Sequence, residues 1–228
     1  SLVEYIANLD DYVSVYFTIN PIPSGHQKSS TDRVILCRRW MLVDIDPVYA
    51  EGNKAPANEA ERQATRELAA IVQHDLVERG WPLPVSVDSG NGWHLLYRVD
   101  LPNDSDSRDL ISKVLESLSK CFSNDKAKID TGVFNASRIS KLPGTWNRKG
   151  VESESRKHRI SRIDSAPPEM EVVTAEQLKD VASFGDDKSE QHGKSALRLK
   201  ASGSMTIVDR AKRYIAKIPG ADGTGGKS

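Results

Sequence analysis

The sequence predicts an α+β fold, because strand patterns and helix patterns follow one another without strict alternation. A strand pattern at residues 41–47 carries apolar and acidic residues in turn, and a hairpin pattern covers residues 84–99. Two amphipathic helix patterns lie at residues 58–80 and 110–122. A doubly wound parallel fold would alternate strand and helix throughout, so we expect a mixed-sheet domain instead.

Two strands are expected near the start of the chain. Apolar and polar residues alternate from 12 to 19, and the Pro- and Gly-containing segment 20–25 ends that strand. The second strand covers residues 40–46 and ends at Pro47.

Helix and turn signals are clearest in the middle of the chain. Asn58 and Glu61 have the spacing of a capping box, and Gly80 is a natural helix end. The turn Ser89-Gly90-Asn91-Gly92 joins two strands of a hairpin. After the second helix we expect a short strand ending at Asp130, an irregular segment through residue 144 and a strand near residues 158–163.

The composition divides the chain into three parts. Residues 1–165 form the main domain, and residues 166–204 hold one short helix capped by Thr174 and Gln177, followed by a flexible linker rich in Gly, Ser, Asp and Lys. Residues 205–228 contain another amphipathic helix, over residues 207–218. That helix lacks a partner surface, so we expect the start of a helical module that continues in a longer protein.

Bulk properties exclude several classes of protein. The two cysteines, Cys37 and Cys121, lie far apart and have no zinc-ligand spacing. Because they also give no disulfide pattern, a reducing cytoplasm is expected. No apolar run reaches the roughly 18 residues of a membrane span, so no membrane partner is expected. The net charge is zero, which argues against a histone-like protein. Residues 138–164 nevertheless carry eight basic side chains against three acidic ones. This excess of positive charge is typical either of an anion-binding face or of a solvated basic segment.

The first chemical motif is Met-Leu-Val-Asp-Ile-Asp-Pro at residues 41–47. Side chains alternate across a strand, so Asp44 and Asp46 share one face. Two carboxylates placed together repel unless cations separate them, and Mg²⁺ and Mn²⁺ prefer such oxygen ligands. The motif predicts a metal site; a strand end with two ordinary exposed aspartates is the alternative.

Two further motifs add groups that bind anions. Gly90 and Gly92 permit a tight turn or a close phosphate contact, and His94 follows on the exit strand; a plain hairpin with a surface histidine is the alternative. In the segment 128–147, Asp130 is followed by Arg138 and Lys141, which suit phosphate but are equally common as surface charges.

The order of these motifs resembles the archaeo-eukaryotic primase superfamily, and specifically the bifunctional primase-polymerases of phages, plasmids and integrated elements. The resemblance rests on the acidic strand at residues 41–47, the Ser-Gly-x-Gly-x-His turn at 89–94, the strand end at Asp130 and the Leu-Pro-Gly-Thr segment at 142–145. It covers residues 16–163. The fold it implies is a catalytic core with an RRM-like unit.

The resemblance implies a DNA primase-polymerase that joins nucleoside triphosphates on a single-stranded DNA template. In that interpretation two ions, Mg²⁺ or Mn²⁺, are held by the catalytic residues Asp44, Asp46 and Asp130. The candidate nucleotide-binding residues are Ser89, Gly90, Gly92, His94, Arg138 and Lys141. The candidate template contacts are Trp146, Arg148, Lys149, Arg156 and Arg159. A helicase domain in the same full-length chain and replication of a phage or plasmid in a bacterial host cell are also implied.

Three other functions would also use parts of this pattern. A catalytically inactive DNA-binding or origin-recognition module with the same fold would tolerate loss of the three aspartates. A phosphatase of the haloacid dehalogenase type would use Asp44 as its nucleophile, but it needs a parallel strand-helix alternation that the pattern lacks. A glycosyltransferase with an Asp-x-Asp metal site leaves residues 142–145 unexplained.

Overall fold

The computed structural model describes residues 14–49 and 55–184. Its centre is a five-stranded sheet in the order β5-β2-β4-β3-β9, and every neighbouring pair in it is antiparallel. The strands are β2 (Arg38–Pro47), β3 (Val85–Asp88), β4 (Trp93–Leu101), β5 (Ala127–Ile129) and β9 (Arg162–Ser165). The predicted α+β class is therefore confirmed, whereas the prediction of a mixed sheet is wrong.

The connections explain why the sheet is antiparallel. Four strands and two helices, α2 (Glu59–Glu78) and α3 (Ser105–Phe122), follow one another as βαββαβ. Helix α2 returns the chain so that β3 runs in the same direction as β2. Strand β4, joined to β3 by the predicted hairpin, fills the position between them and is antiparallel to both.

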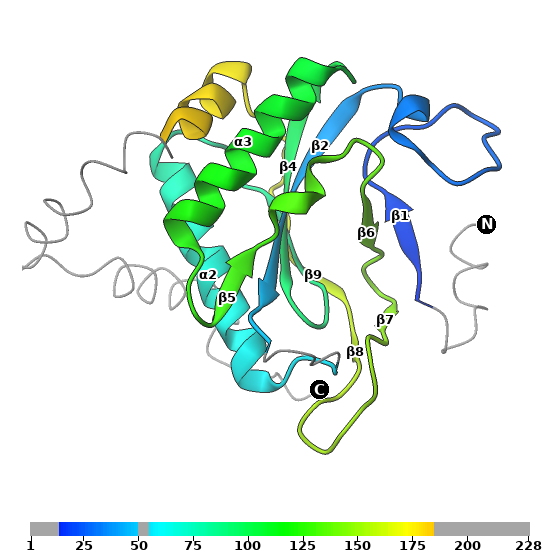
Figure 1. Cartoon of the computed structure of the whole chain (residues 1–228), viewed down its shortest axis with the longest axis vertical. Coiled ribbons are helices and arrows are strands. Elements are labelled where there is room, and N and C mark those ends of the chain that lie inside the picture. The colour runs from blue at the N-terminus through cyan, green and yellow to red at the C-terminus, as the bar shows by residue number, and fades with distance from the viewer. Residues whose placement is uncertain (1–13, 50–54, 185–228) are drawn as a thin grey trace, which may run out of the picture.

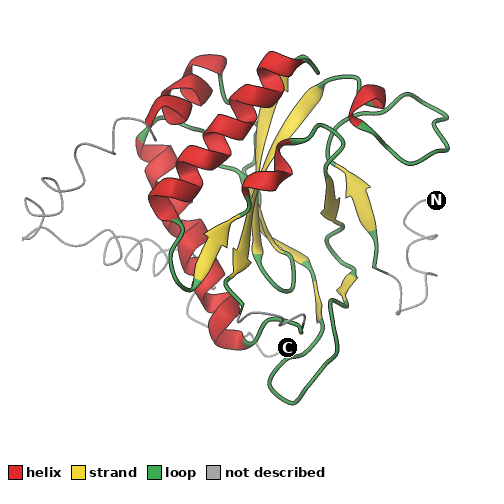
Figure 2. Ribbon diagram, in the orientation of Figure 1, coloured by secondary structure: helices red, strands yellow, loops and turns green. Residues whose placement is uncertain are grey.

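One face of the sheet is covered by helices. Figures 1 and 2 show α2, α3 and a further helix at residues 175–184 on the same side of the strands. Met41, Val43 and Ile45 of β2 are at most 2% exposed and belong to the core. The alternation read from the sequence therefore fixes the opposite face of β2 as the one that bears Asp44 and Asp46.

Shorter elements lie beyond the other face. Strand β1 (Tyr16–Thr18) pairs with β6 (Ile139–Lys141), and β7 (Trp146–Asn147) pairs with β8 (Arg159–Ile160). Two 3₁₀ helices, η1 (Asp32–Val34) and η2 (Thr131–Phe134), precede β2 and β6. The segment before residue 144 was predicted to be irregular, but it contains η2 and β6. Strand β6 forms because it pairs with β1, which is far away in the sequence.

The predicted helix caps form as expected. Asn58 accepts a hydrogen bond from the Glu61 amide while the Glu61 carboxylate accepts one from the Asn58 amide. Thr174 and Gln177 make the same reciprocal pair at the start of the helix over residues 175–184. That helix contributes Leu178 and Val181 to the core, so the compact part of the chain reaches residue 184.

Two predictions lie outside the described residues: the linker beyond residue 184 and the helix at 207–218. In the part of the chain that is described, none of the helices has both the length and the apolar character that a bilayer span requires.

Candidate functional site

Three aspartates occupy neighbouring backbone positions where β2 and β5 run side by side. Asp44 and Asp46 lie on the face of β2 that the helices leave uncovered, and Ile45 between them pairs with Ile129 of β5. Asp130 follows that strand directly, and its amide donates a 2.8 Å hydrogen bond to the Asp44 carbonyl oxygen. Residues 86 positions apart in the chain are therefore adjacent in the backbone ladder.

The electrostatics show that these side chains sense one another. Burial, together with the negative charge of Asp130, raises the pKa of Asp44 to about 6. Burial also raises the pKa of Asp46 to about 6, with contributions from Asp44 and Asp130. At neutral pH the structure therefore holds close negative charges that a cation would stabilise.

The donor set suits a hard divalent cation, because all three side chains offer carboxylate oxygens. Asp130 uses one of its oxygens, Oδ1, to accept a 2.8 Å hydrogen bond from the Gly132 amide. Within residues 14–49 and 55–184, no three His, Cys, Asp or Glu side chains stand close enough together to hold an ion. The residues thus fit Mg²⁺ or Mn²⁺ by chemistry, and their side chains would have to converge on binding.

His94 connects the acidic strand to the second layer. It lies opposite Asp44 in the β2–β4 register, with Nε2 3.4 Å from an Asp44 carboxylate oxygen. Its Nδ1 lies 3.2 Å from the Ser140 hydroxyl of β6. Burial lowers the pKa of His94 to about 4, although the nearby charges of Asp46 and Asp88 act in the opposite direction. The imidazole is therefore neutral at pH 7.

The glycines of the 89–92 turn serve close packing. The Gly90 amide donates to Asp88 Oδ1 at 2.8 Å and the Gly92 amide donates to Ser89 Oγ at 3.0 Å, so both amides have partners within the turn. A side chain at Gly92 would collide with the backbone carbonyl of Ile45 and come within 3.2 Å of an Asp46 oxygen. The turn therefore presses against the acidic strand, and phosphate binding by Ser89, Gly90 and Gly92 stays a prediction.

Arg138 lies beside the carboxylates, whereas Lys141 faces another way. The Arg138 guanidinium donates to the carbonyl of Gly132 at 2.8 Å, and its charge lowers the pKa of Asp44. Ser140 faces His94, so the next residue, Lys141, points to the opposite side of β6. Its Nζ lies 5.0 Å from the Tyr16 ring centroid and makes no hydrogen bond within the described chain. Burial lowers the pKa of Lys141 to about 8.

The candidate template residues divide into two groups. Arg156 donates from both terminal nitrogens to Glu61, and Arg159 donates to the carbonyl of Ala57 at 2.7 Å, so these two arginines have partners within the protein. Arg148 lies over the Trp146 ring, 4.9 Å from its centroid. Lys149 lies near enough to Asp44 and Asp46 for its charge to lower the pKa of both.

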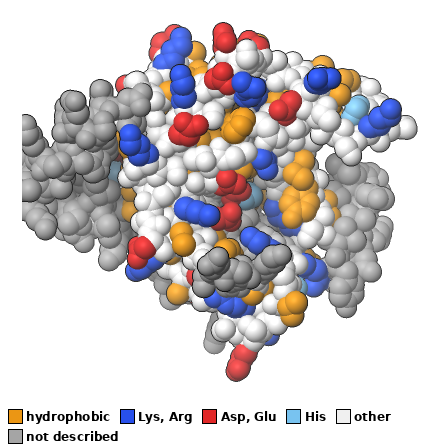
Figure 3. All heavy atoms as spheres, viewed as in Figure 1, with side chains coloured by type: hydrophobic (Ala, Val, Ile, Leu, Met, Phe, Trp, Pro, Cys, Tyr) orange, Lys and Arg blue, Asp and Glu red, His pale blue; other side chains and the backbone are white. Residues whose placement is uncertain are grey.

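Sequence reasoning missed three side chains that shape this site. Ser140 contacts His94, and Glu61 fixes Arg156. Tyr49, three residues after Asp46, has a buried hydroxyl without a hydrogen-bond partner in the described chain. The position of Tyr49, shortly after the acidic strand, was the sequence signal that could have identified it as a site residue. Figure 3 shows acidic side chains and a histidine near the middle of one face, with basic side chains around them.

Comparisons with known proteins give little beyond this geometry. No protein-family model matches the chain, and a search of curated proteins finds no similar sequence. A solved structure described as the crystal structure of primase RepB′ aligns with 79% of this chain at 13% identity and a TM-score of 0.38. The chain spans about half of that protein, since 51% of it is covered. A similarity of this size carries no argument, and the functional conclusion depends on the site itself.

Proposed function

We propose that this chain is a primase-like nucleotidyltransferase, which joins nucleoside triphosphates on a single-stranded DNA template. The observation that carries the proposal is the adjacency of Asp44, Asp46 and Asp130 on neighbouring strands, where their charges influence one another, with neutral His94 beside Asp44. The βαββαβ order, with strands arranged β5-β2-β4-β3, supports an RRM-like unit as the scaffold.

The three aspartates are the residues that would hold two divalent cations, Mg²⁺ or Mn²⁺. Such ions, when bound, make a hydroxyl a better nucleophile and offset the charge on the triphosphate and the departing pyrophosphate. The protein's own contribution is to place Asp44 and Asp46 on a paired strand, with Asp130 directly after the neighbouring strand, and to keep the Asp44 and Asp46 carboxylates partly out of water. The Asp44 side chain is only 22% exposed, which strengthens its interaction with any cation.

His94 and Arg138 are suited to binding the anionic substrate. A neutral imidazole with one N–H can donate to a phosphate oxygen without forming a fixed ion pair with Asp44. The Arg138 guanidinium is held by Gly132 and by Asn135, whose side-chain oxygen accepts from Nε at 2.9 Å. A side chain fixed in this way loses little entropy when it binds phosphate. His94 would act by hydrogen bonding and Arg138 by its charge, and positioning of this kind is most of what phosphoryl transfer requires.

The template is proposed to contact Trp146 and Arg148, whose aromatic and cationic groups suit stacked bases and phosphates. For a chain of zero net charge such binding should be weak and should fall as salt rises. An inactive origin-recognition module would share this surface, so DNA binding alone does not separate the two functions.

Nucleotide incorporation separates them. The 228-residue chain is incubated with a single-stranded template, labelled ribo- or deoxynucleotides and Mg²⁺ or Mn²⁺, with and without a primer. The Asp44→Ala/Asp46→Ala variant should lose product by at least about a thousandfold, because the charge stabilisation that carries the reaction is removed. An Asp106→Ala/Asp109→Ala variant, on the exposed face of α3, is the matched control. Equal product from the two double variants would remove the proposed function and leave the inactive module.

A further inference from the structure

Residues 146–160, here called the basic hairpin, are fastened to the first turn of helix α2. Both terminal nitrogens of Arg156 donate to the Glu61 carboxylate, at 2.6 and 2.7 Å, and one of them also donates to the Pro56 carbonyl at 2.8 Å. Each of the two charged side chains is only 20% exposed. A two-pronged ion pair of this kind defines geometry as well as supplying energy.

A second set of contacts fastens the base of the basic hairpin. The side-chain amide of Asn147 donates to the Ser89 carbonyl at 2.7 Å, and Arg159 reaches the Ala57 carbonyl. Gly90 lies so close that a side chain there would come within 3.0 Å of the Asn147 Cβ and 3.1 Å of the Arg159 carbonyl oxygen. The hairpin is therefore held against the same turn that packs on the acidic strand.

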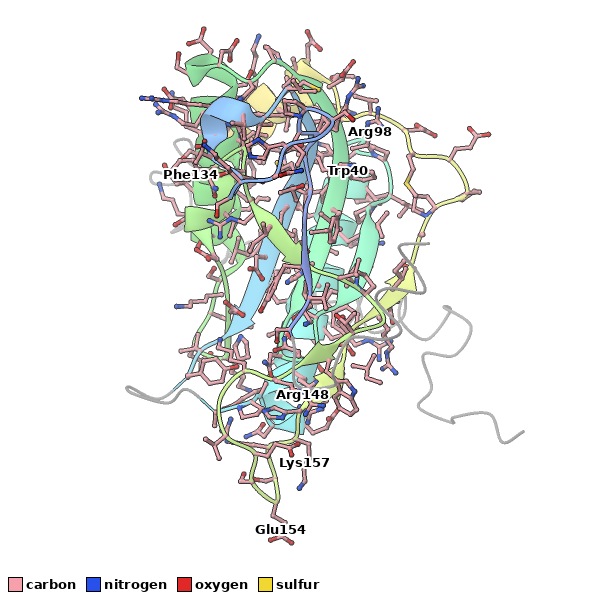
Figure 4. All side chains as sticks on the ribbon, turned by 90° about the vertical axis from the view of Figure 1, so that its right-hand side faces the viewer. Trp40, Arg98, Phe134, Arg148, Glu154 and Lys157 are labelled. Atoms are coloured by element: carbon pink, nitrogen blue, oxygen red, sulfur yellow. The ribbon has the colours of Figure 1, made fainter. Side chains whose placement is uncertain are left out.

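This attachment places Lys149 over Tyr49, just beyond the end of the acidic strand. Its Nζ lies 5.1 Å from the ring centroid of Tyr49, the residue that follows Asp46 by three positions. Its charge is felt by both Asp44 and Asp46. The side chain is exposed, so its ammonium is accessible to a ligand beside the aspartates. In contrast, Lys157 and Glu154 lie toward the tip of the hairpin, away from the sheet (Figure 4).

We propose that Lys149 is a phosphate-binding residue of the nucleotide site, and that Arg156 and Glu61 are positioning residues that hold it there. The inference rests on the proposed function, since the ligand is a nucleoside triphosphate bound beside Asp44 and Asp46. It reassigns part of the basic hairpin from the template to the incoming nucleotide. The ammonium group of Lys149 is a compact charge on a flexible side chain, so it can adjust to the position of the phosphates. The contacts of Arg156 and Asn147 hold the hairpin backbone and so limit the region that the ammonium group can reach.

Equilibrium binding of a labelled deoxynucleoside triphosphate in Ca²⁺, without DNA, tests the role of Lys149. Lys149→Ala should weaken this binding about tenfold or more, as expected for loss of a charged hydrogen bond. The affinity of the Lys149→Ala variant for a single-stranded oligonucleotide should stay within about twofold of the wild-type affinity. Lys157→Ala removes the same charge from the same hairpin and should change neither affinity by more than about twofold. A loss of oligonucleotide binding without a loss of triphosphate binding, or equal effects of the two variants, would overturn the proposal.

A double-mutant cycle tests the positioning role. Arg156→Gln removes the grip on Glu61 but leaves the α2 cap between Asn58 and Glu61 in place, so the fold should survive. If Arg156 acts through Lys149, Arg156→Gln weakens triphosphate binding, and Arg156→Gln/Lys149→Ala binds no more weakly than Lys149→Ala alone. Arg156→Lys should restore part of the affinity. Additive losses in the double variant would contradict the positioning role.

The outcomes also separate this inference from the proposed function. If triphosphate binding depends on Lys149 but the protein incorporates no nucleotide, the role of Lys149 is supported and the nucleotidyltransferase function is contradicted. If wild type incorporates nucleotides but Lys149→Ala and Lys157→Ala bind triphosphate equally well, the nucleotidyltransferase function is supported and the role of Lys149 is contradicted.

Discussion

The Nε2 atom of His94 lies 3.4 Å from a carboxylate oxygen of Asp44, directly across the β2–β4 pair. The two side chains respond to their shared burial in opposite ways, since burial lowers the pKa of His94 to about 4 and raises that of Asp44 to about 6. The charge at this contact between pH 7 and 8 is therefore carried by the aspartate, and the histidine acts as a neutral hydrogen-bonding group.

This assignment predicts that His94 does not titrate in the physiological range. Its ring resonances, identified by their loss in His94→Gln, should not undergo the full change of imidazole protonation between pH 8 and pH 5.5 in nuclear magnetic resonance spectra without added metal; a smaller change with a midpoint near pH 6 would report protonation of Asp44. A full change with a midpoint near the ordinary value of about 6.5 would show that the imidazole is more solvated than its buried position indicates.

Removing the charge of Asp44 should stabilise the metal-free protein at alkaline pH. A carboxyl whose pKa is raised on folding binds its proton more tightly in the folded state, so wild type loses stability as pH rises from about 4 to about 6. Above pH 6 the folded protein bears the full cost of the charged Asp44 side chain. The free energy of unfolding of Asp44→Asn should therefore exceed that of wild type by about 1 to 3 kcal/mol. Urea unfolding in EDTA at pH 8 measures the difference, which should shrink toward zero at pH 4. Asp106→Asn, on the exposed surface of α3, should show no such gain.

Divalent cations should stabilise wild type more than a variant without the paired charges. Mn²⁺ or Mg²⁺ at about 100 times its dissociation constant would contribute about 2.7 kcal/mol to a protein that binds it only when folded. Thermal unfolding with increasing Mn²⁺ should therefore show a rising midpoint for wild type and a flat one for Asp44→Asn/Asp46→Asn. Parallel curves for the two proteins would place any bound ion elsewhere.

Gly92→Ala should damage the fold, since the added methyl group would meet the Ile45 carbonyl of β2. Backbone atoms cannot turn aside as a flexible side chain does, so either β2 or the turn must shift, at a cost of about 1 to 3 kcal/mol. Gly25→Ala is a useful comparison: Gly25 has a positive φ of 79° but no neighbour within 4 Å, so only backbone strain of about 1 kcal/mol is expected there. Equal urea midpoints for the two variants would contradict the packing role of Gly92.

Local patterns were sufficient for much of the fold. The alternation at residues 41–47 correctly separated the buried Met41, Val43 and Ile45 from the two aspartates, because strand geometry has a fixed period. The capping box at Asn58 and the turn at residues 89–92 also depend on neighbours a few positions away, and both formed where the sequence indicated.

Contacts between distant segments could not be predicted in this way. Arg156 and Glu61 are 95 residues apart, and nothing in either local sequence signals that they pair. The run of basic residues after position 138 therefore suggested a continuous template surface, although Arg156 and Arg159 are held within the protein. The charge of Lys149 likewise lowers the pKa of Asp44, whereas Lys141 lies over the Tyr16 ring, on the side of β6 opposite Ser140.

The basic hairpin is pinned at Asn147 on one side and at Arg156 on the other, while its tip at Glu154 projects from the molecule (Figure 4). Changes in the length of this projection would leave both pins in place. A short peptide tag or a fluorophore inserted near Glu154 should therefore be tolerated, and it would provide a reporter at a known distance along the chain from Lys149.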